Sequence, residues 1–558
     1  MSGEAARIPL QRGFSRRSSV VIKAKTSNLD EVLKEIGGCS HYQIRRHVLF
    51  FLISIPFACQ SLFMVFAGQK PDICIEIGLS ECRKIDTTHK EDYCPFSSRQ
   101  YLFMQPEKFS VITEFELVCD KSYLEQIAHS MYFPGGFLGT IVIGWIAHRL
   151  GRKSVMFCCL AIVSLIATLS AFADSFWFLI MARFLTGFFL SGVAVSLYVI
   201  ASEITGATYR FHLDLFIWNY FSVGLMVLAL KAYLLQNWRN LQLVTTLPYL
   251  SVCVFFKVFP ESLRWLWSTG HYTKANKTVS KIAAENKRSD ALNMFPDVLS
   301  IESDDNELGC FVLFRSTRLM MHFVAMAFSS LAVGFSYFGL FLVSDYLSGN
   351  LYTDFALMAA VEIPANFLAI FVARRFGRKK TVMLSFLVTC VISGALFAIT
   401  KDRDREWRYA SLGVALCCKF ALTVASLSSM IWTSEVHKAE GRYQHVGVVN
   451  SLRLLGGTAA PWLTTYSLES DPGVVFAVMS GLSAVAGLLS ILLPETKKTR
   501  DDSMEDSETD YKCLNGTIDQ NLNQTMLTST SEPEKPNIST DIKFDYANLS
   551  QMDRETDI

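Results

Sequence analysis

Charged residues are scarce in this chain. Only 18% of its 558 residues are Asp, Glu, Lys or Arg, against roughly 25% in average soluble domains. The shortage is concentrated in apolar segments of about 20 residues, the length that a helix needs to cross ~30 Å of hydrocarbon. A formal net charge of +1 argues against a nucleic-acid partner. We therefore expect a protein of the lipid bilayer.

Motifs that would bring cofactor chemistry are missing as well. The sequence has no glycine-rich phosphate-binding loop of the Walker type and no cluster of metal-ligating residues. This disfavours ATP-driven pumping and an enzyme, and we predict no cofactor and no metal. The chain also does not begin with a cleavable signal peptide, because residues 1–47 are polar and basic. The first span is therefore expected to act as its own insertion signal.

Cysteines are present but unevenly placed. Of the fourteen, four fall in one polar stretch between the first two predicted spans: Cys74, Cys82, Cys94 and Cys119. Such a group predicts two disulfides in an oxidising compartment. Three pairings are possible, and the sequence does not choose between them.

The chain contains two copies of one pattern. Three landmarks recur in the same order, 226 to 234 residues apart: GWIAHRLGRK (144–153) with IFVARRFGRK (370–379), Glu203 and Arg210 with Glu435 and Arg442, and Pro260-Glu261-Ser262 with Pro494-Glu495-Thr496. Self-similarity at a nearly fixed offset indicates a duplicated unit. Parallel repeats of several spans each are typical of one large class of transporters. We predict an all-α membrane protein with twelve transmembrane helices in two six-helix bundles.

The predicted organisation has five parts. They are a basic N-terminal arm (1–47), an N-terminal bundle (48–259) with a Cys-bearing loop (69–121), a charged linker (260–318), a C-terminal bundle (319–494) and an acidic tail (495–558) with the composition of a disordered segment. The loops after spans 2, 4, 8 and 10 are rich in Lys and Arg. By the positive-inside rule these loops and both termini should be cytosolic.

The expected spans follow from the apolar runs. They lie at about 48–68, 123–147, 154–173, 176–199, 211–234 and 241–259 in the first half, and at about 319–343, 353–373, 381–399, 409–433, 446–468 and 473–493 in the second.

Several strings resemble the major facilitator superfamily and, within it, the organic cation/anion/zwitterion transporter family. The most specific are PESLRWL at 260–266, SGNLYTDF at 348–355, VEIPA at 361–365 and FELVCDK at 115–121. The resemblance covers about residues 30–500. It implies two bundles that rock about a midplane site, which opens to one face of the membrane at a time.

By this resemblance the repeated basic turns would act as gates. Arg149, Arg152 and Lys153 would pair with Glu203 and with helix C-terminal carbonyls, stabilising the outward-open state. The alternative is that these charges only set the topology. The predicted gating residues are Gly144, His148, Arg149, Gly151, Arg152, Lys153, Glu203, Arg210, Gly377, Arg378, Glu435 and Arg442.

The chain departs from the family pattern in these turns. The family normally has Asp where this chain has His148, and the second copy has Arg374 at the equivalent position. The usual carboxylate latch would then be missing in both halves. A weakened latch is the simpler interpretation, and a latch tuned by histidine protonation is the other.

The predicted substrate site centres on Glu362, an ionisable residue in the middle of a span and hence a functional hypothesis by default. It could attract a cationic group, or form an interhelical ion pair such as one with Arg453. Aromatic faces attract ammonium groups, and family position suggests Tyr198, Trp218 and Tyr337, each of which could instead serve packing alone.

Span 11 does not fit the family's charge pattern. The cation branch often has Asp, and the anion and zwitterion branches Arg, where this chain has Leu454. Arg453 lies one residue earlier, and a one-residue step turns a helical side chain by roughly 100°. Arg453 therefore need not reach the cavity.

The resulting hypothesis is a facilitative or exchange carrier of small organic cations or zwitterions in the plasma membrane. Two alternatives stay open. One is an organic anion exchanger of the same fold, which would depend on Arg453. The other is a non-transporting membrane receptor or scaffold, suggested by the altered latch.

Overall fold

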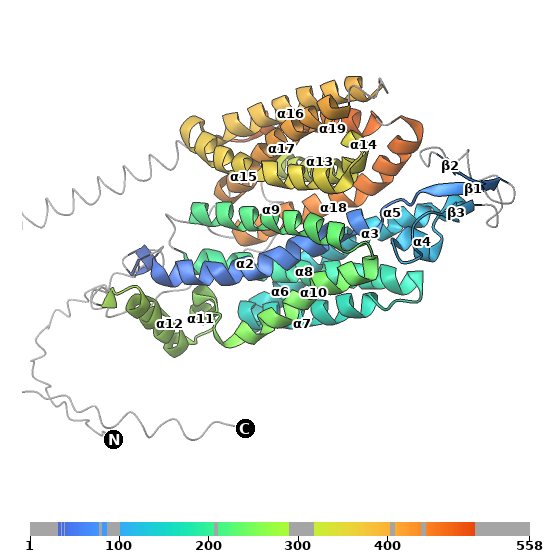
Figure 1. Ribbon diagram of the computed structural model, residues 1–558. Helices are drawn as coiled ribbons and strands as arrows, with labels where there is room; N and C mark the ends of the chain where they lie inside the picture. Colours follow the sequence, from blue (N-terminus) through green and yellow to red (C-terminus); the bar gives the residue numbers. More distant parts are fainter. Residues whose placement is uncertain are drawn as a thin grey trace, which may run out of the picture. The chain divides into compact units, whose positions relative to one another are not determined.

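The computed structural model describes residues 32–34, 36–37, 40–77, 81–85, 101–205, 210–289, 317–401, 408–436, 442–471 and 473–496. Long helices dominate this part of the chain (Figure 1). In the first half they are α2 (His41–Ser61), α5 (Tyr123–Ser130), α6 (Tyr132–Leu150), α7 (Arg152–Ser170), α8 (Phe176–Ile204), α9 (Arg210–Leu234) and α10 (Trp238–Cys253). In the second half they are α13 (Thr317–Leu342), α15 (Leu351–Phe376), α16 (Arg378–Lys401), α17 (Arg408–Val436), α18 (Arg442–Ser470) and α19 (Val474–Leu489).

Each predicted span overlaps one of these long helices, with α5 and α6 together forming the second span. Within the described residues, nine helices are long and apolar enough to cross a membrane. The other three predicted spans correspond to α2, α10 and α18. α10 has only 16 residues, while α2 begins with a polar turn and α18 carries polar side chains along much of its length. The predicted all-α membrane fold is confirmed.

The helices pack into two groups that match the sequence repeat. In the first half α8 packs on α6 and α7, α2 on α9, and α7 on α10. In the second half α13 packs on α18, and α16 packs on α17 and α19, while α15 contacts α17. The halves meet along two seams, one between α9 and α15 and the other between α18 and α5–α6.

The predicted Cys-bearing loop is folded into a small cap. It contains the strands β1 (Ile73–Ile77), β2 (Glu81–Ile85) and β3 (Tyr101–Phe103), with β1 paired antiparallel to both others, followed by α4 (Val111–Phe115) and the short 3-10 helix η2 (Cys119–Lys121). Cys74 and Cys119 are both disulfide-bonded. The side chains of Cys82 and Cys94 lie outside the described residues, so the pairing stays open.

A buried ion pair ties this cap to the bundle. Glu114 on α4 accepts hydrogen bonds from Arg239 Nε at 3.0 Å and from Trp238 Nε1 at 2.6 Å, both at the start of α10. The Arg239 guanidinium also donates to the carbonyls of Ala171 and Ala173, just beyond α7. One arginine therefore holds three segments of the chain together.

Replacing Glu114 by Gln should therefore destabilise the protein. Removing one partner of a fully buried ion pair typically costs about 3–5 kcal/mol, and we expect a smaller loss here because the Arg239 side chain is 17% exposed and Asp174 lies 4.0 Å from it. Thermal unfolding of the purified variant in detergent should show a clearly lower midpoint. Glu116→Gln is the matched control, since Glu116 is exposed two residues away. Equal midpoints for the two variants would contradict this role of Glu114.

At the opposite end of the bundle, the predicted linker contains α11 (Leu263–Ser268) and α12 (Tyr272–Glu285) (Figure 1). Residues 290–316 of the linker lie outside the described part of the chain. The apolar side chains of Leu263, Leu266 and Val279 on these helices form a cluster with Val32 and Leu33. The sequence interpretation took residues 1–47 as a basic N-terminal arm. Within this segment Val32 and Leu33 are buried against the linker helices, and α2 begins at His41, before the predicted start of the first span.

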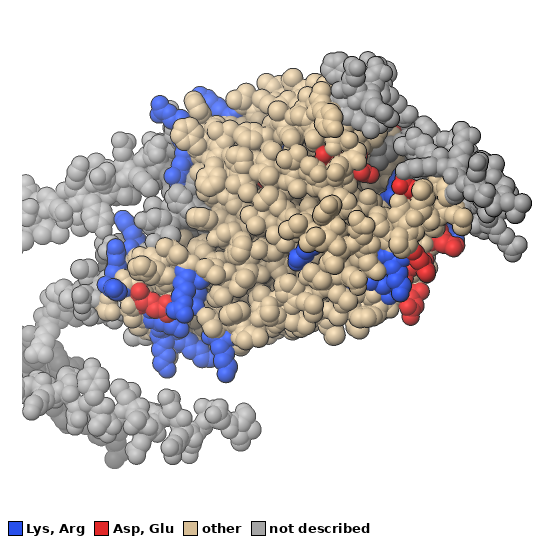
Figure 2. All heavy atoms as spheres, in the orientation of Figure 1, with Lys and Arg blue, Asp and Glu red and all other residues tan. Residues whose placement is uncertain are grey.

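Charge is distributed along the bundle as the membrane prediction requires. Figure 2 shows Lys and Arg gathered at the end where α11 and α12 lie, with acidic and basic residues near the cap and a broad uncharged surface between them. Lys and Arg on the first turns of α7 and α16 and on α12 belong to the basic end: Arg152, Lys153, Lys274, Lys277, Lys281, Arg378, Lys379 and Lys380.

Short elements complete the described part of the chain. They are α3 (Phe63–Ala67), α14 (Ser344–Ser348), η4 (Val254–Lys257) and η9 (Ser490–Leu492). The predicted acidic tail lies outside the described residues from 497 onward.

Candidate functional site

The middle of α15 carries a buried carboxylate, that of Glu362. The Glu362 side chain is only 4% exposed, and its Oε1 atom lies 2.9 Å from Lys419 Nζ on α17, a side chain with no exposed surface. Both charges have thus left water, which is costly unless each has a partner. The interhelical ion pair considered from the sequence is present, but the partner of Glu362 is Lys419 and not Arg453. α17 packs directly against α15, and its lysine takes the place next to Glu362.

The second carboxylate oxygen of Glu362 faces the other half of the protein. Ser222 Oγ on α9 donates a hydrogen bond to Glu362 Oε2 at 2.6 Å. One turn along α15, Asn366 Nδ2 donates to Asn219 Oδ1 on α9 at 3.0 Å. The carboxylate therefore bridges the seam between the halves.

Contacts between the halves also lie on the cap side of Glu362. Near the start of α15, Tyr352 Oη donates to Gln69 Oε1 at 3.2 Å, and the Phe355 ring lies 4.8 Å from that of Phe66 on α3. Glu362 thus lies between two layers of contacts along α15, one toward the cap and one toward the basic end.

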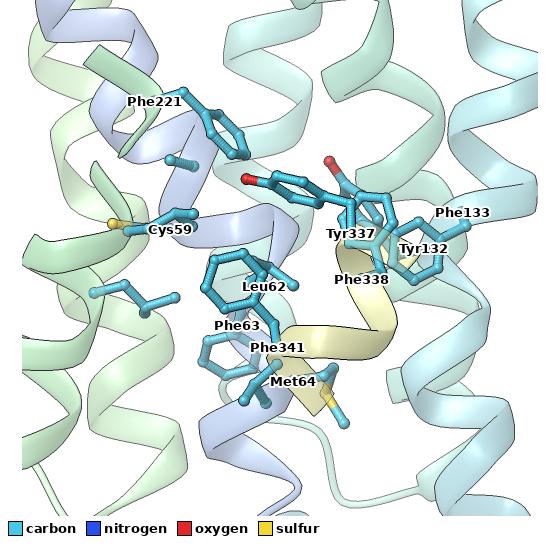
Figure 3. Packing of buried hydrophobic residues seen from close by; sticks show 14 of the residues in the cluster. Cys59, Leu62, Phe63, Met64, Tyr132, Phe133, Phe221, Tyr337, Phe338 and Phe341 are labelled. Atoms are coloured by element: carbon cyan, nitrogen blue, oxygen red, sulfur yellow. The ribbon is translucent and has the colours of Figure 1, made fainter. Parts of the chain in front are cut away.

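Aromatic rings complete the surroundings of the Lys419 ammonium. Its Nζ atom lies 3.3 Å from the ring centroid of Tyr337 and 4.0 Å from that of Phe341, both on α13. Such cation–π contacts favour a cation over the ring face. In Figure 3 Tyr337, Phe338 and Phe341 project from one helix into a cluster with Phe63 and Phe133. A carboxylate and two aromatic faces therefore form a seat for an ammonium group, which we call the ammonium seat (Glu362, Tyr337 and Phe341).

The structure brings most, not all, of the predicted substrate residues to this seat. Tyr337 forms its wall, and Trp218 on α9 lies at the seam, where it packs against the cluster that includes Ala365 and Ala369 of α15. The Arg453 guanidinium lies 5.6 Å from the Trp218 ring, across the seam. The sequence interpretation that Arg453 need not reach the cavity stays a prediction. Tyr198 is half-buried on α8, and its role at the site stays a prediction.

Sequence reasoning missed Lys419 and Ser222. Lys419 is preceded and followed by apolar residues in VALCCKFALTV (414–424). It is therefore an ionisable residue inside a span, which the rule used for Glu362 would also have selected. Ser222 carried no such signal, because a serine in a transmembrane helix normally bonds to its own backbone, as Ser222 also does to the Trp218 carbonyl.

The repeated motifs meet at the basic end of each half. In the first half Arg152, at the start of α7, lies 3.8 Å from Glu203, near the end of α8. Ser262 donates a hydrogen bond to Glu203. Glu261 accepts from the backbone N–H of Lys153 at 3.0 Å and so caps the N-terminus of α7, where a negative charge is favoured by the helix dipole. We call these residues the first inner cluster.

The second half repeats this arrangement. Arg378 at the start of α16 lies 2.8 Å from Glu435 near the end of α17, and Thr496 donates to Glu435 at 2.7 Å. Glu495 accepts from the backbone N–H groups of Arg378 at 3.0 Å and Lys379 at 3.2 Å. This is the second inner cluster, and its match with the first confirms the sequence repeat at the level of side-chain contacts.

The inner clusters contain carboxylates, but not at the turn positions where the family pattern has its latch acid. The carboxylate at each junction comes from Glu261 and Glu495, not from the turn positions held by His148 and Arg374. His148 is exposed, and its carbonyl accepts a hydrogen bond from Trp265 Nε1 at 2.9 Å. Nothing in this geometry makes the His148 ring part of a latch.

The remaining gating predictions have mixed outcomes. Gly151 (φ 96°) and Gly377 (φ 94°) make the predicted turns, and a Cβ atom at either would press on the capping glutamate. Gly144, also among the predicted gating residues, has no heavy atom within 4 Å of the place where a Cβ would lie. The Arg149 guanidinium lies 4.1 Å from the Trp145 ring, and Lys153 Nζ 4.4 Å from that of Phe256. The side chains of Arg210 and Arg442 lie outside the described residues.

Comparison with known proteins gives consistent matches. The family model "Sugar (and other) transporter" matches residues 90–506. "Solute carrier family 22 member 1" of Oryctolagus cuniculus is 30% identical over 86% of this chain and 95% of its own length. "Organic cation transporter protein" of Drosophila melanogaster is 28% identical over 86% of this chain and 94% of its own length. Among solved structures, the inward-open xylose transporter XylE from E. coli has a TM-score of 0.59 at 15% identity, covering 82% of this chain and 97% of its own.

Proposed function

Since this chain belongs to solute carrier family 22 of the major facilitator superfamily, we propose that it carries small organic cations across the plasma membrane by alternating access. Its relatives include "Organic cation transporter protein" and "Organic cation transporter-like protein" of Drosophila melanogaster. The observation that carries the proposal is the ammonium seat, a buried carboxylate faced by two aromatic rings at the seam between the halves.

The seat has the chemistry that an organic cation needs. A quaternary ammonium group cannot donate hydrogen bonds, so its affinity comes from a carboxylate and from aromatic faces. The two layers of contacts along α15 would open in turn, the layer at Tyr352 toward the cap and the layer at Asn366 toward the basic end. The basic end, with α11 and α12, is cytosolic in this proposal, as the positive-inside rule requires.

Uptake by purified protein in proteoliposomes tests the proposal. The panel is labelled tetraethylammonium as cation, glycine betaine as zwitterion and benzoate as anion. We expect saturable uptake of tetraethylammonium that unlabelled cations inhibit. Saturable uptake of benzoate alone would replace this proposal by the anion exchanger, and binding without uptake of any panel member would favour a receptor.

The inner clusters are proposed to hold the basic end of each half together, so that each bundle moves as one body. Replacing Arg378 by Gln would leave Glu435 without its ion-pair partner in the second cluster. We expect the maximal uptake rate to fall about tenfold, a change of roughly 1.4 kcal/mol in the barrier, while the substrate concentration at half-maximal rate changes little. Initial rates over a range of tetraethylammonium concentrations separate the two parameters.

Lys380→Gln is the matched control for this prediction. It removes one positive charge from the same helical turn, but Lys380 is exposed and its loss should leave the rate near that of the wild type. Equal rates for the two variants would show that the charges act only on membrane topology.

A further inference from the structure

The charges at the ammonium seat do not suit a cation carrier at first sight. One carboxylate, that of Glu362, is paired with Lys419 on α17, and a second cationic side chain, Arg453 on α18, lies over the ring of Trp218 at the seam. Lys419 already takes the place that a substrate ammonium would need, 2.9 Å from the carboxylate and over two rings. An organic cation that enters beside it would meet a like charge in a medium of low dielectric constant, which is strongly unfavourable.

We propose that Lys419 is a built-in cation that fills the ammonium seat, and that each organic cation enters as the Lys419 ammonium releases its proton, so that the protein exchanges organic cations for protons. This inference rests on the proposed function. In the exchange one Nζ–H bond of Lys419 breaks, its electron pair stays on the neutral amine, and the proton leaves to the side on which the site is open. When the cation departs on the other side, Lys419 takes a proton there and returns to Glu362.

Lysine is the side chain that can do this. A buried lysine loses its proton readily, whereas arginine keeps its charge in proteins. Lys419 has no exposed surface, and no hydrogen-bond acceptor in the described part of the chain meets its Nζ with good geometry. The ammonium is therefore held only by the carboxylate charge and the ring faces, both of which an organic cation can take over. The charge of the site is the same before and after the exchange.

The groups that face Lys419 support the assignment of the proton to this residue. Glu362 comes from α15 and Tyr337 from α13, while Arg453 of α18 lies over Trp218 and contributes a second positive charge. On α17 itself, the titratable residue next to Lys419 is Cys418. Two further helices, α16 and α14, pack on α17. Cys390 on α16 is hydrogen-bonded with Ser480, and Asp345 on α14 is exposed. Protonation of Glu362 instead would leave the buried Lys419 ammonium without its paired carboxylate.

The test uses full-length protein in proteoliposomes with labelled tetraethylammonium, with the pH gradient and the membrane potential set independently. With the potential clamped at zero, an interior one pH unit more acidic should drive about tenfold accumulation, the ratio for one-for-one exchange. A membrane potential alone should drive none, because the exchange moves no net charge.

Variants of Lys419 separate the mechanism from its alternatives. Lys419→Gln removes the built-in cation, so uptake should persist, lose its response to pH and follow an inside-negative potential instead. Lys419→Arg keeps a permanent charge in the seat and should lower uptake at least about tenfold. Lys231→Gln is the matched control. Lys231 lies on α9 and bonds to the Val244 carbonyl, and this variant should behave like the wild type.

Two results would overturn the inference while leaving the proposed function intact. The first is wild-type accumulation that follows the potential and ignores the pH gradient, which would mean that Lys419 moves aside with its proton. The second is a Lys419→Gln variant that stays coupled to pH. Wild-type protein that takes up no cation would instead remove the proposed function itself. Thermal unfolding of each variant verifies folding, and Lys419→Gln alone decides the coupling if Lys419→Arg does not fold.

Discussion

Replacing Glu362 by Gln should abolish the uptake of organic cations. The variant loses the carboxylate that faces the ammonium seat, while size and hydrogen-bonding capacity are nearly kept. Interactions with a buried, hydrogen-bonded charge are typically worth about 3–5 kcal/mol, and each 1.4 kcal/mol is a factor of ten. We therefore expect uptake of tetraethylammonium to fall by a factor of about one hundred or more.

This variant needs a control for folding, because Gln at position 362 leaves Lys419 as a buried charge without its partner. The double variant Glu362→Gln with Lys419→Gln removes both charges. Replacing a buried ion pair by neutral groups is often tolerated, so thermal stability should return toward that of the wild type. Uptake should stay absent. If the double variant carries tetraethylammonium at the wild-type rate, Glu362 is not where the substrate cation binds.

Much of the fold could be predicted from the sequence because the membrane imposes a simple rule on helix length. Every predicted span overlaps a long helix, and the repeated motifs identify the two halves. The ends of the helices were less predictable. α8 continues to Ile204, several residues past the expected end near 199, because Glu203 finds partners in Arg152 and Ser262. An apolar run marks the hydrocarbon layer, not the helix that extends beyond it.

The site was predictable in part for a different reason. The cost of a charge in the membrane singled out Glu362 without any structure. Its partner depends on how α15 and α17 are rotated against each other, which helix packing decides and a single sequence does not reveal. The same limit applies to Arg453, whose position next to Trp218 on α9 depends on how α18 packs against its neighbours as well as on its register along α18.

The two inner clusters show what a repeat can reveal. The recurrence of Glu203 with Glu435 and of Glu261 with Glu495 was visible in the sequence. The pairing of Glu203 with Arg152 was predicted and is present, whereas no role was predicted for Glu261 and Glu495. Glu261 and Glu495 lie more than one hundred residues along the chain from the helix N-termini that they cap. The N-termini of α7 and α16 select them because an anion is favoured at a helix N-terminus.

Replacing Gly334 by Ala adds one methyl group and should destabilise the protein strongly. Gly334 lies where α13 crosses α18, and a Cβ atom there would overlap the backbone carbonyl oxygen of Arg453. A carbonyl of a helix cannot rotate away as a side chain can, so the two helices must separate. Small residues replace the hydrophobic drive at such crossings in membranes, and overpacking a tight contact costs roughly 1–3 kcal/mol or more.

The cost of this methyl group should also appear in transport. α13 carries Tyr337 and Phe341, and α18 carries Arg453, so separation of the two helices displaces the ring faces of the ammonium seat. Thermal unfolding in detergent should show a lower midpoint, and the remaining folded protein should bind tetraethylammonium more weakly. Gly481→Ala on α19 is the matched control, because a Cβ atom there meets nothing within 4 Å. If the two alanine variants unfold at the same temperature, the α13–α18 crossing is looser than its contact distances indicate, and the seat does not depend on it.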